Sequence, residues 1–177
     1  MRRALTRHPE SLGTTAIRVE VEAVRTGASV LLLNYFAIGE LENLIIPTEE
    51  LPVRADGLWQ RTCFEAFVRA AGSAYYEFNF APSLQWAAYR FDGYREGMTV
   101  AREIEQPHME VQSDESCLQL QVVLDLAGLA NLRQEDVWRL VLSAVIEEAS
   151  GHKSYWALAH PVGKPDFHHS DGFVLEL

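Results

Sequence analysis

The sequence predicts an all-β protein, an antiparallel β-sandwich of the jelly-roll or immunoglobulin-like type with one or two short helices. Roughly ten segments have the composition or alternation of strands, helix-forming stretches are scarce, and strands and helices do not alternate as they do in βαβ units. A chain of 177 residues suits one hydrophobic core. We therefore expect a single domain spanning residues 1–177.

The first two predicted strands differ in pattern. From Ala16 to Arg25 apolar and charged residues alternate, which is typical of a strand with one solvated face. From Ser29 to Ile38 the chain is almost continuously apolar and is bounded by Gly27 and Gly39. This second run predicts a strand buried on both faces.

The middle of the chain predicts a hairpin. Thr62 to Arg69 and Ala74 to Ala81 have strand patterns, Pro82-Ser83 interrupts the second, and Gln85 to Phe91 resumes it. Before them, the prolines and the Asp-Gly pair in ENLIIPTEELPVRADGLW predict an excursion over the surface. Later strands are expected at Thr99 to Ile104, His108 to Val111, Cys117 to Leu124, Trp138 to Ile146, Ser154 to His160 and Phe173 to Leu177. A helical turn or two fits Leu126 to Glu135, which lacks β-branched residues.

Composition excludes several classes of partner. The net charge of -10 opposes binding to nucleic acid and to anionic membranes. The N-terminal residues contain no apolar run of the length that a secretory signal needs, so we expect a cytoplasmic protein. Cys63 and Cys117 lie in apolar runs, which favours buried free thiols over a disulfide.

Aromatic residues are concentrated in YYEFNFAPSLQWAAYRF and the residues just after it. Eight of the eighteen aromatic residues lie between Tyr75 and Arg95, and they form either a core or a platform for a flat ligand. Because successive side chains of a strand point to opposite faces, Tyr76, Phe78 and Phe80 share one face, which we assign to the core.

The opposite face of the hairpin mixes aromatic and polar groups. We expect it to display Tyr75, Glu77 and Asn79, and across the turn Trp86 and Arg90. Aromatic planes beside carboxylate, amide and guanidinium groups are what sugar recognition requires. The alternative is a cross-strand ion pair between Glu77 and Arg90 on a solvated face.

A resemblance to a known group of proteins begins just upstream. GLWQRTCFEAFV carries the spacing W-x-x-T-x-x-E-x-F, with Trp59, Thr62 and Glu65 in it, and YYEFNFAPSLQWAAYRF follows. Together these stretches, with the tail from Tyr155 onward, resemble the DOMON-like ligand-binding domains, which are related to the family 9 carbohydrate-binding modules. The resemblance implies a β-sandwich that binds sugars or haem. It implies a sugar clamp formed by Trp59, Glu65 and Trp156, although Thr62 stands where relatives often carry Asp.

The C-terminal segment HPVGKPDFHHSDGF gathers histidine and aspartate. His160, Asp166 and His168 could bind a divalent metal and activate a water molecule, as in a metal-dependent hydrolase or lyase. The adjacent His168 and His169 would point apart in a strand, however, and the prolines and glycines equally predict a rigid surface loop.

Haem is the other ligand that the resemblance brings into question, and no cofactor can be named from the residues. His108, Met109 and Met98 are of the types that hold haem iron, but their positions favour loop or core roles. The sequence thus favours a non-catalytic module for a small ligand, a carbohydrate fitting best, at Trp59, Glu65, Glu77, Asn79, Arg90 and Trp156. The alternatives are the metal-dependent enzyme, a haem binder, and a protein-interaction sandwich that forms a homodimer.

Overall fold

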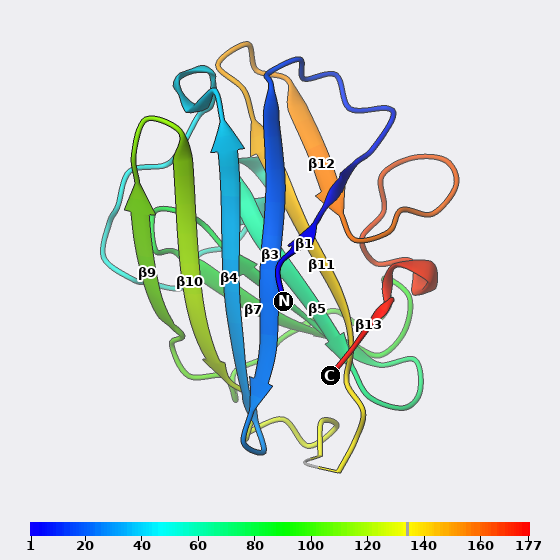
Figure 1. Cartoon of the computed structure of the whole chain (residues 1–177). Helices are drawn as coiled ribbons and strands as arrows, with labels where there is room; N and C mark the ends of the chain where they lie inside the picture. The colour runs from blue at the N-terminus through cyan, green and yellow to red at the C-terminus, as the bar shows by residue number, and fades with distance from the viewer. Residues whose placement is uncertain (134) are drawn as a thin grey trace.

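Two antiparallel sheets packed face to face form the part of the chain that the computed structural model describes, residues 1–133 and 135–177 (Figure 1). In the described residues the first sheet has five strands in the order β1 (Arg3–Ala4), β3 (Ile17–Thr26), β4 (Val30–Gly39), β10 (Cys117–Asp125) and β9 (His108–Ser113). The second sheet has eight strands, namely β2 (Thr6–Arg7), β12 (Lys153–Ala157), β11 (Arg139–Glu147), β5 (Cys63–Arg69), β6 (Tyr75–Phe80), β7 (Trp86–Phe91) and β8 (Thr99–Val100) in that order, with β13 (Leu175–Glu176) pairing with β11. The predicted all-β sandwich is confirmed. Strands β1, β2, β8 and β13 are only two residues long, and β1 and β2 have no counterpart in the sequence prediction.

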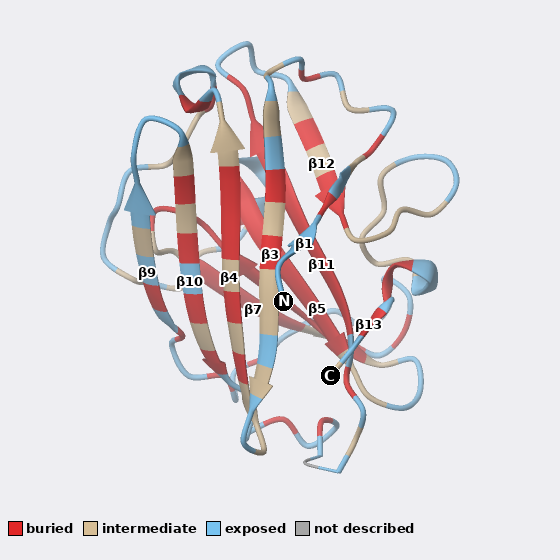
Figure 2. Ribbon diagram, in the orientation of Figure 1, coloured by how far each residue is buried: buried red, intermediate tan, exposed pale blue. Residues whose placement is uncertain are grey.

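The main core lies between the sheets. In β10, Leu118, Leu120, Val122 and Leu124 are all fully buried, while the residues between them are half-buried or exposed. Figure 2 shows this alternation along the five-stranded sheet and the nearly continuous burial of the eight-stranded sheet behind it. Burial of one face of each sheet supplies the hydrophobic stabilisation of a sandwich.

Strand β4 corrects one prediction. Its residues Leu31, Leu33, Tyr35 and Ala37 face the core, but the intervening Val30, Leu32 and Asn34 are only half-buried. Apart from Phe36, which is buried under the Arg2 guanidinium, the apolar run is buried on one face, because this strand lies in the sheet whose second face meets solvent.

The β6–β7 hairpin forms at the predicted turn. The Ala81 N–H donates to the Gln85 carbonyl at 2.9 Å, and Leu84 adopts a left-handed φ of 71°. The resulting register places Tyr76 opposite Arg90 and Phe80 opposite Trp86.

That register corrects the predicted face. Trp86 and Arg90 lie on the same side of the sheet as Tyr76 and Phe78, not beside Glu77 and Asn79. Cross-strand partners share a face, so the turn decides which residues meet, and a shift of one residue inverts the set. The face that carries Glu77 displays Tyr89 and Phe91 instead.

The outer face of the eight-stranded sheet is covered rather than solvated. A second apolar cluster, here called the outer cluster, consists of Leu58, Cys63, Phe67, Tyr75, Ala81, Ala87, Tyr89, Phe91, Val141 and Phe173. The chain near the 3-10 helix η2 (Leu58–Gln60) and the C-terminal segment lie over these strands. The interpretation of this face as a solvated surface is wrong, because two distant segments fold back over it.

The short helices do not lie at the predicted position, Leu126 to Glu135. The described residues contain 3-10 helices at η1 (Leu41–Asn43), η2 and η3 (Ser170–Gly172). Between Leu126 and Glu135 the described residues form hydrogen-bonded turns rather than a helix, and residue 134 lies outside them. Within the described chain, none of the helices has the length and apolar character needed to cross a membrane.

Candidate functional site

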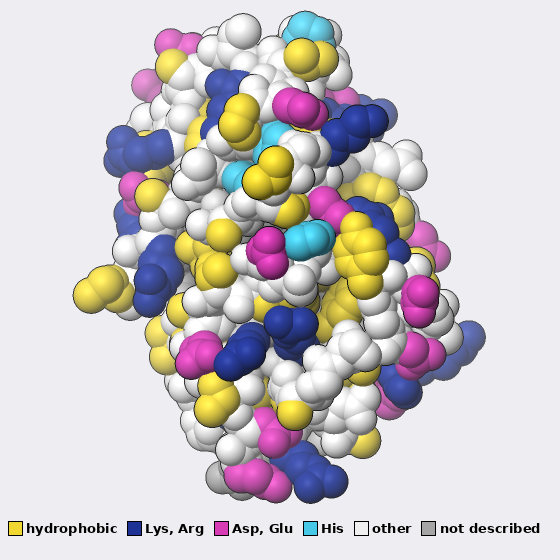
Figure 3. All heavy atoms as spheres, turned by 90° about the vertical axis from the view of Figure 1, so that its right-hand side faces the viewer, with side chains coloured by type: hydrophobic (Ala, Val, Ile, Leu, Met, Phe, Trp, Pro, Cys, Tyr) yellow, Lys and Arg dark blue, Asp and Glu magenta, His cyan; other side chains and the backbone are white. Residues whose placement is uncertain are grey.

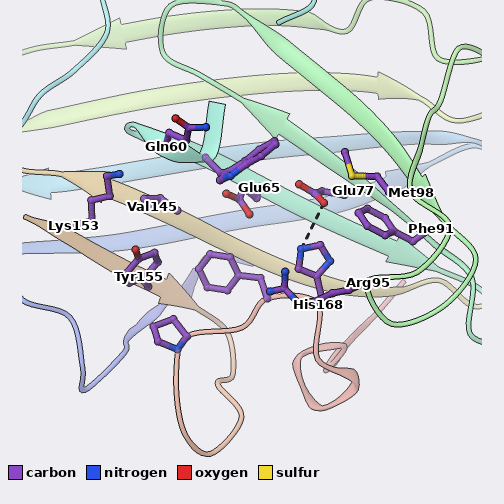
Figure 4. Close-up of a pocket in the computed structure, with 13 residues that line it drawn as sticks. Gln60, Glu65, Glu77, Phe91, Arg95, Met98, Val145, Lys153, Tyr155 and His168 are labelled. Carbon is purple, nitrogen blue, oxygen red and sulfur yellow. Dashed lines mark ion pairs between the residues drawn. The ribbon is translucent and has the colours of Figure 1, made fainter. Parts of the chain in front are cut away.

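A pocket of about 460 Å³ lies on the outer face of the eight-stranded sheet, between the sheet and the segments that cover it. Its lining comes from η2, β5, β6, β7 and the loop after it, β11, β12 and the C-terminal segment, as Trp59, Gln60, Glu65, Glu77, Phe91, Arg95, Met98, Val145, Lys153, Tyr155, Pro165, Phe167 and His168. In Figure 4, Lys153 and Tyr155 enter from one side, Arg95 and Met98 from the other, and Glu65 and Glu77 lie between them.

Two glutamates form the floor of the pocket. Glu65 on β5 and Glu77 on β6 are 3% and 5% exposed. Glu65 is paired in register with Asn79, two residues from Glu77, so the two carboxyl groups are diagonal neighbours on one face of the sheet. The antiparallel pairing of β5 with β6 thus brings the two acids together, although a turn separates them in the sequence.

The surroundings raise the pKa of both carboxyl groups. Burial, and then the nearby Glu77, hold the pKa of Glu65 well above its usual range. Burial also raises the pKa of Glu77, while a hydrogen bond from the Asn79 amide at 2.7 Å acts in the opposite direction. The pair therefore holds protons more tightly than two exposed glutamates would.

One oxygen of this pair has no protein partner. Glu65 Oε1 is buried and accepts no hydrogen bond from the described residues. In contrast, Glu77 Oε1 accepts from Asn79, and Glu77 Oε2 lies 3.8 Å from His168 Nε2. A buried acceptor without a donor costs free energy, which a donor on a ligand would recover.

His168 is held neutral beside the floor. Its Nδ1 lies 2.7 Å from the Tyr75 hydroxyl, and that hydroxyl accepts from the backbone N–H of Arg95 at 3.2 Å. In the tautomer in which Tyr75 O–H donates to Nδ1, the imidazole proton is on Nε2 and faces Glu77. Burial, and then the positive charge of Arg95, lower the pKa of His168 to about 4.

A polar latch closes one side of the pocket. The Arg95 guanidinium donates to Asp166 Oδ1 at 2.8 Å, the Tyr94 hydroxyl donates to Asp166 Oδ2, and the His168 N–H donates to Oδ1 at 3.1 Å. Arg95 has a left-handed φ of 56°, which a non-glycine residue rarely adopts. The loop after β7 is thereby tied to the C-terminal segment.

Aromatic side chains form the walls. Trp59 is 39% exposed and meets Tyr89 edge to face, with ring centroids 6.1 Å apart. Phe91, Tyr155 and Phe167 also line the pocket. Figure 3 shows the face of the molecule on the side of the C-terminal segment, where hydrophobic side chains lie among acidic, basic and histidine ones.

Three of the residues predicted to bind the ligand meet in this pocket, namely Trp59, Glu65 and Glu77, and His168, which was predicted as a metal ligand, also lines it. Asn79 shares their face but is fully buried behind Glu77, which it orients through its amide. Asn79 is thus a supporting residue and does not line the pocket.

Two other predicted residues lie elsewhere. Arg90 is on the inner side of the sheet and pairs with Asp92 at 3.1 Å. Trp156 is 6% exposed and belongs to the main core, where its indole N–H donates to the Ser154 hydroxyl at 2.9 Å. The neighbouring Tyr155 points the other way and lines the pocket, because alternation sends adjacent side chains of β12 to opposite faces.

The predicted metal ligands do not converge. His160 Nε2 bonds the Thr6 carbonyl at 2.7 Å, Asp166 binds Arg95, and His168 binds Tyr75. Among the residues that the structure describes, no group of three or more His, Cys, Asp or Glu side chains is arranged to hold a metal ion. The metal hypothesis is corrected accordingly, since each side chain already has a different protein partner.

The haem-type residues are also dispersed. Met109 is buried in the main core, His108 is exposed and lies 3.0 Å from Glu110, and Met98 is at the pocket. Cys63 is a buried free thiol in the outer cluster, and Cys117 is free and partly exposed.

Several lining residues were not found from the sequence. The sequence prediction placed Phe91 on the correct strand, but it assigned the wrong residues of that strand to the face that carries Glu77. It also selected Trp156 for the sugar clamp instead of the adjacent Tyr155. Arg95, Lys153 and Phe167 come from segments distant in sequence, and no local pattern brings them together.

The fold is similar to that of solved carbohydrate-binding proteins. A candidate carbohydrate-binding protein from Bacteroides uniformis superimposes with a TM-score of 0.66 at 14% identity, over 98% of this chain and 84% of that one. A family 9 carbohydrate-binding module from Caldicellulosiruptor kristjanssonii, in complex with cellotriose, gives a TM-score of 0.50 at 7% identity, over 90% of this chain and 74% of that one. No protein-family model and no curated protein matches the sequence. At these identities the similarity establishes the fold, and the ligand must be argued from the site.

Proposed function

We propose that this protein is a DOMON-like, carbohydrate-binding module that holds a small sugar in the pocket over Glu65 and Glu77 without transforming it. The observation that carries the proposal is the unpartnered Glu65 Oε1 at the floor of a pocket walled by aromatic rings. Sugars combine hydroxyl donors with apolar C–H faces. A pocket with buried carboxyl acceptors and aromatic walls offers both contacts.

The two kinds of contact come from different elements. Trp59 offers an exposed indole, and Tyr155 and Phe167 provide ring surface from β12 and the C-terminal segment. Glu65 and Glu77 supply the acceptors, and Asn79 and the Tyr75–His168 pair fix the position of Glu77. The volume of about 460 Å³ is in the range of small-molecule sites. The family 9 module of similar fold, which was solved in complex with cellotriose, supports this ligand class.

The proposal is tested by calorimetric titration with a panel of mono- and disaccharides. Trp59→Ala should weaken binding of the tightest sugar by about tenfold or more, because an aromatic wall of the pocket is lost. Leu51→Ala, which removes an apolar side chain that is 79% exposed and lies outside the pocket, is the matched control.

Two results would count against the proposal. One is that no sugar on the panel binds the intact chain. The other is that Trp59→Ala binds as tightly as the control. Magnetic resonance spectra of the sugar before and after prolonged incubation check that it is bound and released unchanged.

A further inference from the structure

The floor of the pocket holds two buried carboxyl groups, one of which lacks a protein partner in the described residues. Glu65 makes no ion pair within the described chain, and its Oε1 accepts no hydrogen bond there. At 3% exposure the carboxyl group has also lost most of its contact with water. Buried carboxyl groups are normally paired or hydrogen-bonded, so an unsatisfied acceptor in the floor of a pocket points to a donor on the ligand.

The cations that line the pocket form no ion pair with Glu65 in the described residues. His168, from the C-terminal segment, lies 3.8 Å from Glu77 but is neutral near pH 7, because its pKa is about 4. Arg95, from the loop after β7, binds Asp166 at 2.8 Å. Lys153, from β12, enters from the side of the pocket and makes no ion pair with either glutamate in the described residues (Figure 4).

Among the described residues, the other titratable groups close to Glu65 add no positive charge. Glu77 faces it from β6, and Cys63 precedes it by two residues on the same face of β5. Burial raises the pKa of the Cys63 thiol well above its usual range, so this group is uncharged. A ligand that brings its own positive charge would therefore complete the site.

From this arrangement we infer that the ligand is an amino sugar with a free amine, whose ammonium group donates to Glu65 and Glu77. The inference rests on the proposed function and specifies the class of sugar. An ammonium group has three donors, which suit the open Glu65 carboxylate together with Glu77 Oε2. Any proton held by the glutamate pair leaves to solvent on binding, so the complex is an ion pair with no covalent change.

An amine fits better than another hydroxyl. Hydrogen bonds between two charged groups are roughly twice as strong as those between neutral groups, and the gain is greatest where water is excluded. The net charge of -10 also attracts a cationic ligand and repels an anionic one.

The test compares three hexosamines, glucosamine, galactosamine and mannosamine, with glucose, galactose and mannose by calorimetry at about pH 7. We expect at least one hexosamine to bind about tenfold or more tightly than its neutral parent. N-acetylation of that hexosamine, which removes the charge, should abolish the advantage.

Two substitutions test whether Glu65 causes the preference for hexosamines over hexoses. Glu65→Gln should reduce the ratio of hexosamine to hexose affinity to near one, since the amide cannot pair with the ammonium group. Glu22→Gln, on the far sheet, makes the same change in net charge and should keep the ratio. Thermal unfolding of each variant confirms that it is folded.

The outcomes separate the two proposals. If neutral hexoses bind as tightly as hexosamines, or if Glu65→Gln keeps the preference, the amino-sugar inference is wrong while sugar binding stands. If none of the sugars binds the intact chain, both proposals fail.

Discussion

At the scale of single residues, Glu65 lies in an environment that changes its ionisation. It is a buried carboxyl group whose pKa is raised by burial and by a neighbouring acid. Such a group lends stability that is fully present below its unfolded pKa of 4.5 and is lost as the pH rises through the folded value, because the folded state binds the proton more tightly.

The first prediction concerns the direction in which stability changes with pH. The free energy of unfolding of the natural chain should fall relative to that of Glu65→Gln as the pH rises from about 4 to about 9, since the Glu65 carboxyl group ionises only in the natural chain. Urea denaturation of both chains across this range measures the difference. His168 titrates in both chains, so its contribution cancels. A difference that stays constant with pH would show that Glu65 has an ordinary pKa.

The second prediction uses two adjacent residues on opposite faces of β12. Trp156→Ala should cost about 3–5 kcal/mol of unfolding free energy, because it leaves a cavity in the main core. Tyr155→Ala should instead weaken sugar binding with a smaller loss of stability, because Tyr155 lines the pocket. Denaturation measures the stability of both variants, and calorimetry measures their sugar binding. If Trp156→Ala instead weakened binding and Tyr155→Ala caused the larger loss of stability, the two side chains would be assigned to the wrong faces.

At the scale of elements, Thr62 ties the segment before the hairpin to the sheet. Its side chain is fully buried, donates to the Ile45 carbonyl at 2.6 Å and accepts from the Glu147 N–H at 3.1 Å. Both bonds join chain segments distant in sequence, and they hold the start of β5 beside the end of β11.

The third prediction concerns this junction. Thr62→Val keeps the shape but removes the hydroxyl, which leaves one buried donor and one buried acceptor unpaired. We expect a loss of about 1–3 kcal/mol in unfolding free energy. Thr26→Val, at an exposed position at the end of β3, is the control and should change stability little. Equal stabilities of the two variants would show that the Thr62 hydroxyl bonds contribute nothing.

Strands were more predictable than the contacts between them. The long strands follow from alternation in the sequence, as in Ile17–Thr26, and the hairpin turn follows from Pro82-Ser83. The face of Trp86 and Arg90 was missed because it depends on the number of residues in the turn, and Leu84 in its left-handed conformation gives no sequence signal.

At the scale of the whole molecule, the sandwich itself was predictable from composition and strand spacing, and the similarity to solved structures agrees with it. The site was predictable only in part. Trp59, Glu65 and Glu77 lie within one stretch of sequence, whereas the C-terminal segment that covers the sheet is about a hundred residues away. Its fold-back over Tyr75 and Phe91 turns an expected open platform into a covered pocket.

The central claim is that a sugar binds in this covered pocket, and chemical-shift mapping by NMR tests it most directly. The isotope-labelled protein is titrated with the sugar that binds most tightly in calorimetry, and the backbone amide shifts are followed. We expect the largest changes at Trp59, Glu65, Glu77, Tyr155 and His168, which share the pocket but come from distant parts of the chain. Changes confined to the five-stranded sheet, at a sugar concentration that saturates binding, would contradict the account.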